Sequence, residues 1–511
     1  LVYLAAALSL EPAAAWRLAA LTAVCIGGHV LVRTGAWSSF TAAYNRGCSG
    51  MVRWAVMGVL LLVAAVVIVM QIVAGGEYRA SRLQALAGTA VFMGLSVALS
   101  SNMEGIPWAQ VTAGFLLQFF LGCLVMKSEA GMHFFEEVGT AVSDFLELSD
   151  VGKELVFGAN FEEHLVAFKI LPTVFFFSAF ISVMYYLGVM QATVRVVAVA
   201  LKMTVGSSLV QSVNAAGNLF LGQTEAPLLI RPFLDKASPS DIHCVMVGGF
   251  ASVSGTVLAA YIGMGISPTE LLAASVMSVP GTLFVSNLVC PPGSMPEDDP
   301  SAQALEQAEG SSSDGEESAE EEPDAGDHFE FPPVVENNII EAAGNGAHTA
   351  IDLVLNIGAM LLAFRSLIAA VDMALGYLGG LVRTPELSFA LICSYAFWPL
   401  AWLLGTPVED CSLVARLIGT KVFINEFVAY SELGGLIDED GHGGGISRRG
   451  QLVATYALCG FSNVGSVGVQ LGCLSSLCPG RSKVFAKLVV SAMITGNVVC
   501  FLTATFAMLL A

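Results

Sequence analysis

The chain has 511 residues, of which 55% are hydrophobic and only 13% are charged, and its formal net charge at pH 7 is −20. Soluble domains have about 25% charged residues, so this composition excludes an ordinary soluble protein. The negative charge is local, because 14 of the 42 acidic residues and none of the 22 basic ones lie in residues 291–331, which we expect to form a solvated, disordered loop without a specific partner.

Long apolar runs predict a multi-pass helical membrane protein. Residues 54–74 alone contain the roughly 20 apolar residues that cross a bilayer, and the alternation typical of a membrane β-barrel is absent. Because the chain begins with Leu1 and not with methionine, we expect it to lack its natural N-terminus. In chain order, spanning helices are expected near residues 13–32, 54–74, 84–101, 107–126, 165–189, 242–264, 270–290, 350–378, 451–471 and 484–510.

Two further segments have a helical pattern but are amphipathic. Residues 132–149 place acidic side chains on one face and apolar ones on the other, the apolar ones being Phe134, Val138, Val142 and Phe145. This pattern is typical of a helix that lies in the plane of the membrane interface. Residues 333–354 are expected to enter the span near 350–378 in the same way.

Two regions interrupt the regular pattern of spans. Residues 204–234 and 385–435 each have apolar halves too short to cross a bilayer, separated by polar residues. Each region is followed by a span rich in glycine and serine, at residues 248–263 and 459–472. Paired broken segments in matching places of two halves indicate the binding site of a transporter, because non-helical backbone at membrane depth must line a cavity or be buried in protein.

Each broken region contains one prominent carboxylate, Glu225 in the first and Glu426 in the second. A charged side chain at the centre of a membrane helix costs about 2.5–3.5 kcal/mol on insertion scales, so it indicates a function. The alternative is a structural carboxylate at a helix start, where freed amide groups favour it. Neutral oxygens that suit sodium lie near both acids, although small residues also serve helix packing; they belong to Asn218, Ser252, Ser254, Asn463 and Ser466.

The sequence lacks the common motifs of metal and nucleotide chemistry. None of the 11 cysteines stands in a zinc-binding spacing, and most lie in apolar runs as small core residues. Cys473 and Cys478 flank a short loop and could pair. There is no Walker loop, dinucleotide fingerprint or HExxH helix.

Several segments resemble the signature segments of the concentrative nucleoside transporter family. They are GNLFLGQTEAPLLIRPFL (217–234), GGFASVSGTVLAAYIG (248–263), FINEFVAY (423–430) and TYALCGFSNVGSVGVQLG (455–472). The likeness continues in the same order from about Leu83 to the C-terminus. One departure is Gln211, where the family commonly has a glutamate, and this departure bears on packing and on the coupling ion.

The resemblance implies an all-α transporter with inverted repeats and two re-entrant helical hairpins, in which a transport domain slides against the scaffold of a homotrimer in the plasma membrane. It implies sodium-driven nucleoside uptake without a further cofactor; proton coupling and a nucleobase substrate are the alternatives. It divides the chain into N-terminal helices (1–82), a scaffold and core region with an interfacial helix (83–203), the first hairpin with its following helices (204–290), the acidic loop (291–331), an interfacial helix with a long span (332–384), and the second hairpin with the C-terminal helices (385–511).

The resemblance also assigns roles to individual residues. The nucleobase would contact Gln223, Thr224, Glu225 and Val257, and the ribose would contact Glu426, Phe461, Asn463 and Ser466. Sodium would bind Asn218, Ser252 and the backbone carbonyls of Leu221 and Val253. The chemistry of these side chains agrees with the assigned roles. An amide can accept hydrogen bonds from the donors of a base edge and donate to its acceptors, and a carboxylate accepts hydrogen bonds from a diol.

Substrate selectivity is expected to depend on Gly222 and Thr256, which the resemblance places beside the base. Glycine leaves room for a second ring, and Val257 is smaller than the leucine of pyrimidine-selective members, whereas Gln223 is an amide found in members that accept pyrimidines. We therefore expect broad selectivity that leans to purines. Two other classes fit less well: an intramembrane hydrolase with Glu225 and Glu426 as acid and base has no histidine near either acid, and an ion channel would line a continuous polar path.

Overall fold

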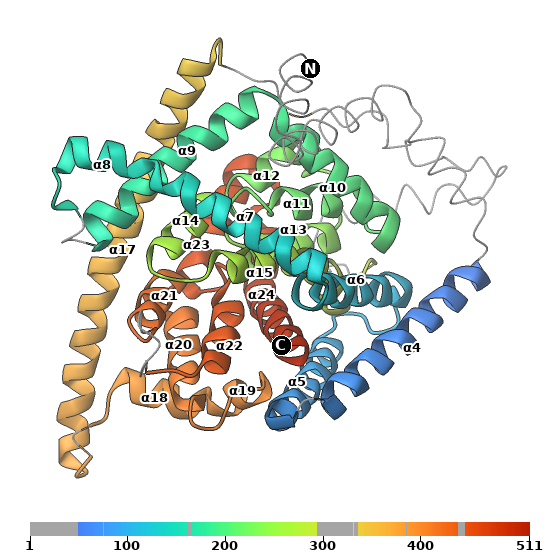
Figure 1. The fold of residues 1–511 in the computed structure, drawn as a ribbon. Coiled ribbons are helices and arrows are strands. Elements are labelled where there is room, and N and C mark those ends of the chain that lie inside the picture. Colours follow the sequence, from blue (N-terminus) through green and yellow to red (C-terminus); the bar gives the residue numbers. More distant parts are fainter. Residues whose placement is uncertain are drawn as a thin grey trace.

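The computed structural model describes residues 50–74, 76–161, 165–293, 331, 336–384, 386–437 and 445–511, and the regular elements within these ranges are all helices (Figure 1). Seven helical segments there are long and apolar enough to cross a membrane. The expected all-α membrane fold is therefore confirmed. The span expected near 13–32 and nearly all of the acidic loop at 291–331 lie outside the described residues.

Three helices form the first part of the described chain, at the lower right of Figure 1. They match the expected spans at 54–74, 84–101 and 107–126 within a few residues, and they are α4 (Gly50–Ala74), α5 (Arg79–Ala98) and α6 (Trp108–Lys127). Only 11% of the most apolar window of α4 is buried in the protein, so its surface is suited to contact lipid or another subunit.

The next segment contains α7 (Glu129–Glu147), α8 (Ser149–Phe157), the π-helix Leu165–Ile170, α9 (Leu171–Tyr186) and α10 (Val189–Val205). α7 coincides with the segment expected to lie at the interface, and it begins after Ser128, whose hydroxyl accepts a hydrogen bond from the Gly131 amide at 3.1 Å. α10 is not predicted from the sequence, because Arg195 and Lys202 interrupt its apolar pattern.

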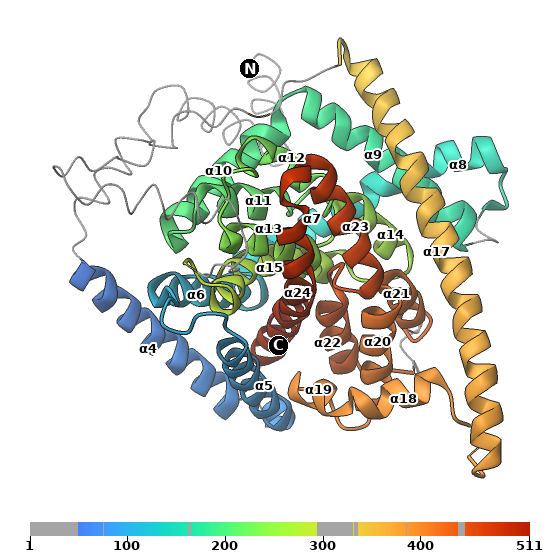
Figure 2. The ribbon, with the colours of Figure 1, turned by 180° about the vertical axis from the view of Figure 1, so that it is seen from behind.

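Two halves of the chain repeat one arrangement, a helical hairpin followed by a broken helix. The first half contains α11 (Leu209–Gly217), α12 (Ala226–Leu229), α13 (Pro239–Ala251) and α14 (Gly255–Gly263). The second half contains α20 (Cys411–Phe423), α21 (Glu426–Gly434), α22 (Arg448–Leu458) and α23 (Val464–Leu477). The long helices α15 (Pro268–Val289) and α24 (Ser482–Leu510) follow the first and the second half. Figure 2 shows α22 and α23 beside α24.

The segments expected as spans at 242–264 and 451–471 are each split into two half-helices, although the first, Pro239–Gly263, is as a whole long and apolar enough to cross a membrane. Ser254 and Asn463 have extended backbones at the splits, and each side chain caps the half-helix that follows. The Ser254 hydroxyl accepts from the Val257 amide at 3.3 Å, and Asn463 Oδ1 accepts from the Ser466 amide at 2.8 Å. Small polar side chains that bond nearby backbone compete with helix continuation. The breaks free backbone groups for other partners.

The helix α17 (Ile339–Leu381) is 43 residues long, and it corrects the expectation of an interfacial entry to the span near 350–378. It runs without a break along the outer edge of the molecule, packed against α9 (Figures 1 and 2). Gly346 permits this close approach, because a Cβ there would clash with the Ser178 carbonyl, and the Ser178 hydroxyl donates to the Gly346 carbonyl at 2.8 Å. Two short helices, α18 (Phe389–Ala396) and α19 (Trp398–Leu403), lead from α17 to the second hairpin.

The core lies around α13, α15 and α24, which pack against one another. In the most apolar windows of α15 and of the segment Pro479–Leu510, 89% of the residues are buried in the protein, against 6% for α17. The broken hairpins and half-helices are therefore held by a buried helical core, while α4, α9 and α17 present apolar surface outward. The residues at the two breaks, 252–254 and 459–463, are all buried.

Candidate functional site

The carboxylate of Glu426 lies where the two breaks of the second half meet. Asn425 caps α21, since its Oδ1 accepts from the Val428 amide at 2.9 Å, and Glu426 is the first residue of that helix. Asn463, in the break between α22 and α23, donates from Nδ2 to Glu426 Oε2 at 2.7 Å. Glu426 and Asn463 are 3% and 2% exposed. Two of the expected ribose contacts are thus brought together in a buried, oriented pair.

A buried cation, which the sequence analysis does not single out, lies on the same hairpin. Lys421 is fully buried, and its Nζ donates to the Ala457 carbonyl at 3.0 Å, near the end of α22. The Nζ also lies 5.9 Å from the ring centroid of Phe501. A lysine at a helix C-terminus satisfies carbonyls that have lost their helical partners. The sequence does contain a signal for this residue, because Lys421 is a charged side chain in an apolar hairpin, five residues before Glu426.

Two buried glutamine side chains, one on the first hairpin and one on α23, have amide atoms without a protein partner. Gln223 is 8% exposed, and its Oε1 is buried without a hydrogen bond. Gln470 on α23 is fully buried, and neither of its amide atoms has a partner. Both side chains lie against Gly249, where an added Cβ would be 2.9 Å from Gln223 Cβ and 2.7 Å from Gln470 Oε1. Gln470 is absent from the expected site, although it stands in the glycine-rich segment 459–472.

The neighbours of Gln223 in the hairpin loop are more open. Thr224 is half-buried, and its carbonyl accepts a hydrogen bond from Cys473 Sγ at 3.4 Å. The Glu225 side chain is exposed, unlike that of Glu426. The two carboxylates expected from the broken regions therefore have different environments, one buried and paired with Asn463, the other at an open hairpin tip.

Two of the expected sodium ligands, Asn218 at the end of α11 and Ser252 at the end of α13, both lie against Gly248. Asn218 is 2% exposed, and both of its amide atoms lack a protein partner. It adjoins Gly248, where a Cβ would lie 2.5 Å from Asn218 Nδ2. The Ser252 hydroxyl donates to the Gly248 carbonyl at 2.7 Å, which leaves its oxygen able to accept or coordinate. Val253 is buried and Leu221 is half-buried.

The two expected selectivity positions, Gly222 and Thr256, both adjoin Ser254. A Cβ at Gly222 would lie 3.3 Å from Ser254 Cβ and 2.5 Å from Glu225 Oε2, and the hydroxyls of Ser254 and Thr256 are 2.9 Å apart. Val257 is 1% exposed, and Phe461 is 8% exposed. The Phe461 amide donates to the Ser252 carbonyl at 3.3 Å, so the breaks of the two halves are joined directly. Ser466 is buried one turn into α23.

The departure from the family pattern at Gln211 has a structural counterpart. Gln211 Nε2 donates to Asp241 Oδ1 at 3.0 Å, and Asn287 Nδ2 donates to Gln211 Oε1 at 3.4 Å. A glutamate here would place a second carboxylate beside Asp241, whereas the amide supplies a donor and an acceptor to its two neighbours. The amide therefore ties α11 to α13 and α15 without a charge.

Comparison with protein-family models matches most of the described core. A model described as "Na+ dependent nucleoside transporter N-terminus" matches residues 87–160, one described as "Nucleoside recognition" matches residues 167–268, and one described as "Na+ dependent nucleoside transporter C-terminus" matches residues 270–508. Together the three models follow one another along the chain from the middle of α5 to α24.

Two curated relatives illustrate the similarity over long alignments. The chain is 40% identical to solute carrier family 28 member 3 of Mus musculus over 435 residues, which are 83% of this chain and 58% of the relative. It is 38% identical to sodium/nucleoside cotransporter 1 of Rattus norvegicus over 457 residues, 88% of this chain and 67% of that relative. The chain thus spans about three fifths of the length of the first of these relatives and two thirds of the second.

Solved structures of CNTnw share the fold. CNTnw in an inward-facing substrate-bound state has a TM-score of 0.73 and 33% identity, over 84% of this chain and 98% of that one. A CNTnw variant in an outward-facing state has a TM-score of 0.75 and 33% identity, over 84% of this chain and 99% of that one. Because both states match equally well, the likeness concerns the fold and does not assign one conformation.

Proposed function

The chain belongs to the concentrative nucleoside transporter family, and from this premise we propose that it takes up nucleosides together with sodium by alternating access, as a multi-pass protein of the plasma membrane. The observation that carries the proposal is the buried pair of Glu426 and Asn463, held where a hairpin and a broken helix meet. A buried carboxylate in a fixed orientation is suited to accept hydrogen bonds from the two hydroxyls of a ribose.

The nucleobase is proposed to lie toward the first hairpin. Gln223 is buried with an unpaired oxygen and adjoins the unpaired amide of Gln470. Unpaired buried polar atoms cost about 1–3 kcal/mol each, so a polar solute that bonds them is favoured. Val257 and Phe461 supply apolar walls, Thr224 and Glu225 lie at the hairpin tip, and Ser466 follows Asn463 on the ribose side.

Sodium is proposed to bind as a co-transported ion at Asn218 and Ser252, with the carbonyls of Leu221 and Val253. Asn218 supports this assignment, because its amide is buried among protein atoms without using either its donor or its acceptor. Neutral oxygens together with carbonyls at a helix break suit sodium. Proton coupling is the alternative, and the names of the relatives favour sodium.

Two finer features are also part of the proposal. Selectivity is broad and leans to purines; in support, Gly222 has no side chain at a point where an added Cβ would meet Glu225 and Ser254, and Ser254 in turn contacts Thr256. The assembly is a homotrimer, which is consistent with the outward apolar surface of α17. The hydrolase alternative is set aside, because the relatives are cotransporters by name.

Uptake of labelled uridine and adenosine tests the function. The full chain is expressed in cells without endogenous nucleoside uptake, in medium with sodium or with choline in its place. We expect the labelled nucleosides to accumulate inside the cells above their external concentration in the sodium medium and not in the choline medium. Uptake that is equal in choline but rises with an inward proton gradient would replace sodium by protons. Equilibration without accumulation would exclude a symporter.

A further inference from the structure

A second buried asparagine, Asn214, stands one helical turn before Asn218 on the first hairpin. It lies within α11, and the Asn218 backbone amide donates to the Asn214 carbonyl at 2.9 Å. The Asn214 side chain is 1% exposed. Because residues four apart in a helix lie on one face, the two asparagine side chains are neighbours.

Both asparagine side chains lie against the same glycine of α13. An added Cβ at Gly248 would be 2.5 Å from Asn218 Nδ2 and 3.0 Å from Asn214 Nδ2. The Ser252 hydroxyl donates to the Gly248 carbonyl at 2.7 Å, so it adjoins this glycine as well. Gly248 is therefore the point at which Asn214 meets two of the proposed sodium ligands, Asn218 and Ser252.

The hydrogen bonds of the two amides are incomplete. Asn214 Nδ2 donates to the Val245 carbonyl at 3.3 Å, whereas Asn214 Oδ1 has no partner in the part of the chain that the structure describes. Neither Oδ1 nor Nδ2 of Asn218 has a partner there. The large majority of buried polar side-chain atoms are hydrogen-bonded, so three unpaired atoms on two neighbouring side chains indicate a place where further bonds form.

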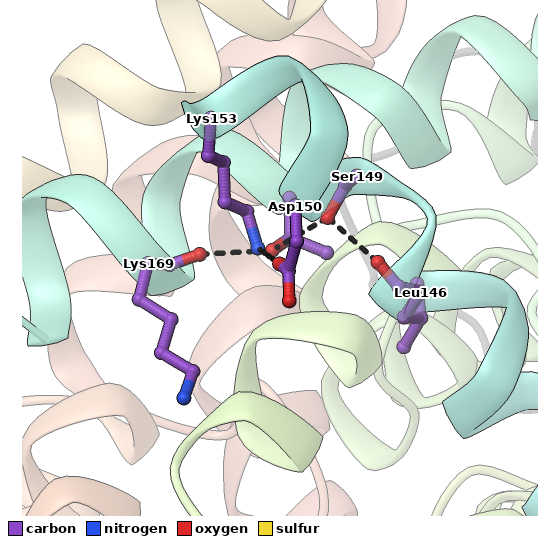
Figure 3. Close-up of polar contacts among 6 residues, drawn as sticks. Leu146, Ser149, Asp150, Lys153 and Lys169 are labelled. Carbon is purple, nitrogen blue, oxygen red and sulfur yellow. Dashed lines mark hydrogen bonds and ion pairs between the residues drawn. The ribbon is translucent and has the colours of Figure 1, made fainter. Parts of the chain in front are cut away.

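Another buried polar cluster, at the corner between α7 and α8, shows the contrast (Figure 3). There, Lys153 Nζ donates to Asp150 Oδ1 at 2.7 Å, and the Ser149 hydroxyl donates to the Leu146 carbonyl at 2.6 Å. These residues line a cavity of about 470 Å³, yet the buried side chains of Lys153 and Ser149 are bonded within the protein. The two asparagines differ in leaving both acceptors and a donor unused.

The chemistry of an amide says how the three unpaired atoms can be satisfied together. Asn218 Oδ1 is the atom that can coordinate sodium, whereas Asn218 Nδ2 can only donate and needs an acceptor. Asn214 Oδ1 is a buried acceptor one turn away, without a partner among the described residues. Because the oxygen and nitrogen of an amide are nearly equal in shape, a half rotation of the Asn218 side chain exchanges their places.

We propose that Asn214 is a positioning residue of the sodium site. When sodium is bound, Asn214 Oδ1 accepts a hydrogen bond from Asn218 Nδ2, and this bond directs Asn218 Oδ1 to the ion. Asn214 is itself held on α13 through the Val245 carbonyl, so the orientation of the ion ligand depends on the contact between α11 and α13. The inference rests on the proposed sodium site and adds to it a residue that does not contact the ion.

Sodium binding by the purified full chain tests the role of Asn214 without any transport measurement. The melting temperature is measured in detergent without nucleoside, while sodium chloride replaces choline chloride at constant ionic strength. An ion that binds the folded state raises the melting temperature in proportion to its occupancy. We expect Asn214→Leu to raise the sodium concentration for half-maximal stabilisation about fivefold, the factor for one hydrogen bond between neutral groups.

Two further variants separate a lost acceptor from a loosened structure. If Asn214→Leu does not fold, Asn214→Ala also lacks the acceptor, and the same rise is expected. The matched control is Asn287→Ala, because Asn287 is a buried asparagine that donates to Gln211 Oε1 on α11 at 3.4 Å. It should lower the melting temperature at every sodium concentration without changing the half-saturation.

Asn214→Asp distinguishes positioning from packing. It keeps an oxygen acceptor, and its negative charge near the ion favours the ion further, so the sodium requirement should stay at or below the wild-type value. A residue that acts only in packing would tolerate a buried carboxylate no better than leucine. A sodium requirement raised as much in Asn214→Asp as in Asn214→Leu would therefore overturn the inference.

A double-mutant cycle distinguishes positioning from direct contact with the ion. Asn218→Asp keeps an oxygen for sodium but has no Nδ2, so Asn214→Leu should not raise the sodium requirement further in that background. The same rise in both backgrounds would make Asn214 an ion ligand and overturn the positioning role. Equal half-saturation in wild type and Asn214→Leu would overturn this inference alone, whereas a wild type that sodium does not stabilise would overturn the proposed sodium site and the inference with it.

Discussion

The buried polar side chains of the proposed site differ in whether the protein supplies their hydrogen-bond partners, as Glu426, Asn218 and Gln223 show. Glu426 accepts a hydrogen bond from Asn463, whereas Asn218 and the Gln223 oxygen are buried without partners. A buried polar group left unpaired costs about 1–3 kcal/mol. The sequence predicts these residues as polar groups in apolar segments, but it cannot tell which of them the fold leaves unpaired, because their partners come from other helices. Gln470 is invisible to the sequence analysis for the same reason.

Glu426→Gln should nearly abolish nucleoside uptake while the protein remains folded. The amide replaces one accepting oxygen by a donor and removes the charge, which costs about 1.5–3 kcal/mol for a charge-assisted hydrogen bond. The measurement is initial uptake of labelled uridine at low concentration, with surface expression determined in parallel. The control is Glu409→Gln, an exposed glutamate outside the site. Wild-type uptake by Glu426→Gln would remove Glu426 from the substrate site.

Asn218→Ala and Ser252→Ala should raise the sodium concentration needed for half-maximal uptake. Each removes a neutral oxygen from the proposed ion site, and by linkage a weaker ion site also weakens nucleoside binding. The measurement is uptake against sodium concentration, with Asn345→Ala as the control at an exposed position on α17. A sodium dependence that stays unchanged in both variants would place the ion elsewhere or favour protons.

Gly222→Ser should reduce purine uptake relative to pyrimidine uptake. The new side chain would meet Glu225 and Ser254, so it crowds the junction between the hairpin tip and the start of α14. An added group in a pocket discriminates by about 1–3 kcal/mol, so strict exclusion is not expected. The measurement is competition of excess inosine or thymidine against labelled adenosine. Unchanged competition by both in Gly222→Ser would place position 222 away from the base, and wild-type uptake blocked by thymidine but not by inosine would contradict the purine preference.

The helical elements show what local sequence decides and what tertiary contacts decide. Apolar length predicts α4, α6 and α15 closely. The breaks at Ser254 and Asn463 escape that criterion, because their flanking halves are themselves apolar and a window of span length averages across them. The cap residues carry the missing signal, since each precedes its half-helix with a side chain that accepts from an amide three residues on.

Asn425→Ala should lower both the thermal stability and the uptake rate. Loss of an N-cap side chain costs about 1 kcal/mol, and this cap sets the start of α21, where Glu426 stands. Asn425→Ser keeps a cap and should recover most of both properties. The control is Ser388→Ala, which removes the cap of α18 and should lower the melting temperature without a comparable loss of uptake per folded molecule. Equal losses of uptake in the two alanine variants would show that the α21 cap has no particular role in positioning Glu426 for uptake.

At the scale of the whole molecule, the helices fall into a central group that is buried in protein and an outer group that is exposed. α13, α15 and α24 are mostly buried, while α4, α9 and α17 are mostly exposed to their surroundings. Overall hydropathy predicts that all of these helices cross the membrane, yet it cannot separate the two groups, because a helix buried in protein and one that faces lipid are equally apolar. Glycines at helix contacts bring the central helices close together, such as Gly496 on α24, where an added Cβ would lie 2.6 Å from Phe250 Cβ on α13.

Deletion of residues 298–327 should leave nucleoside uptake and its sodium dependence nearly unchanged. The deleted segment is acidic and has no apolar periodicity that could pack on the helices. Changing the length of a flexible loop costs little, about 0.6 kcal/mol per doubling. The deletion keeps Phe331, which packs on the core with the Arg195 guanidinium 5.4 Å from its ring centroid, so the contact that anchors the chain before α17 is retained.

Surface expression and initial uptake are measured together for the deletion variant. The comparison is Phe331→Ala in the full chain, which is expected to lower surface expression. Reduced uptake per molecule at the surface in the deletion variant would show that the acidic loop takes part in transport.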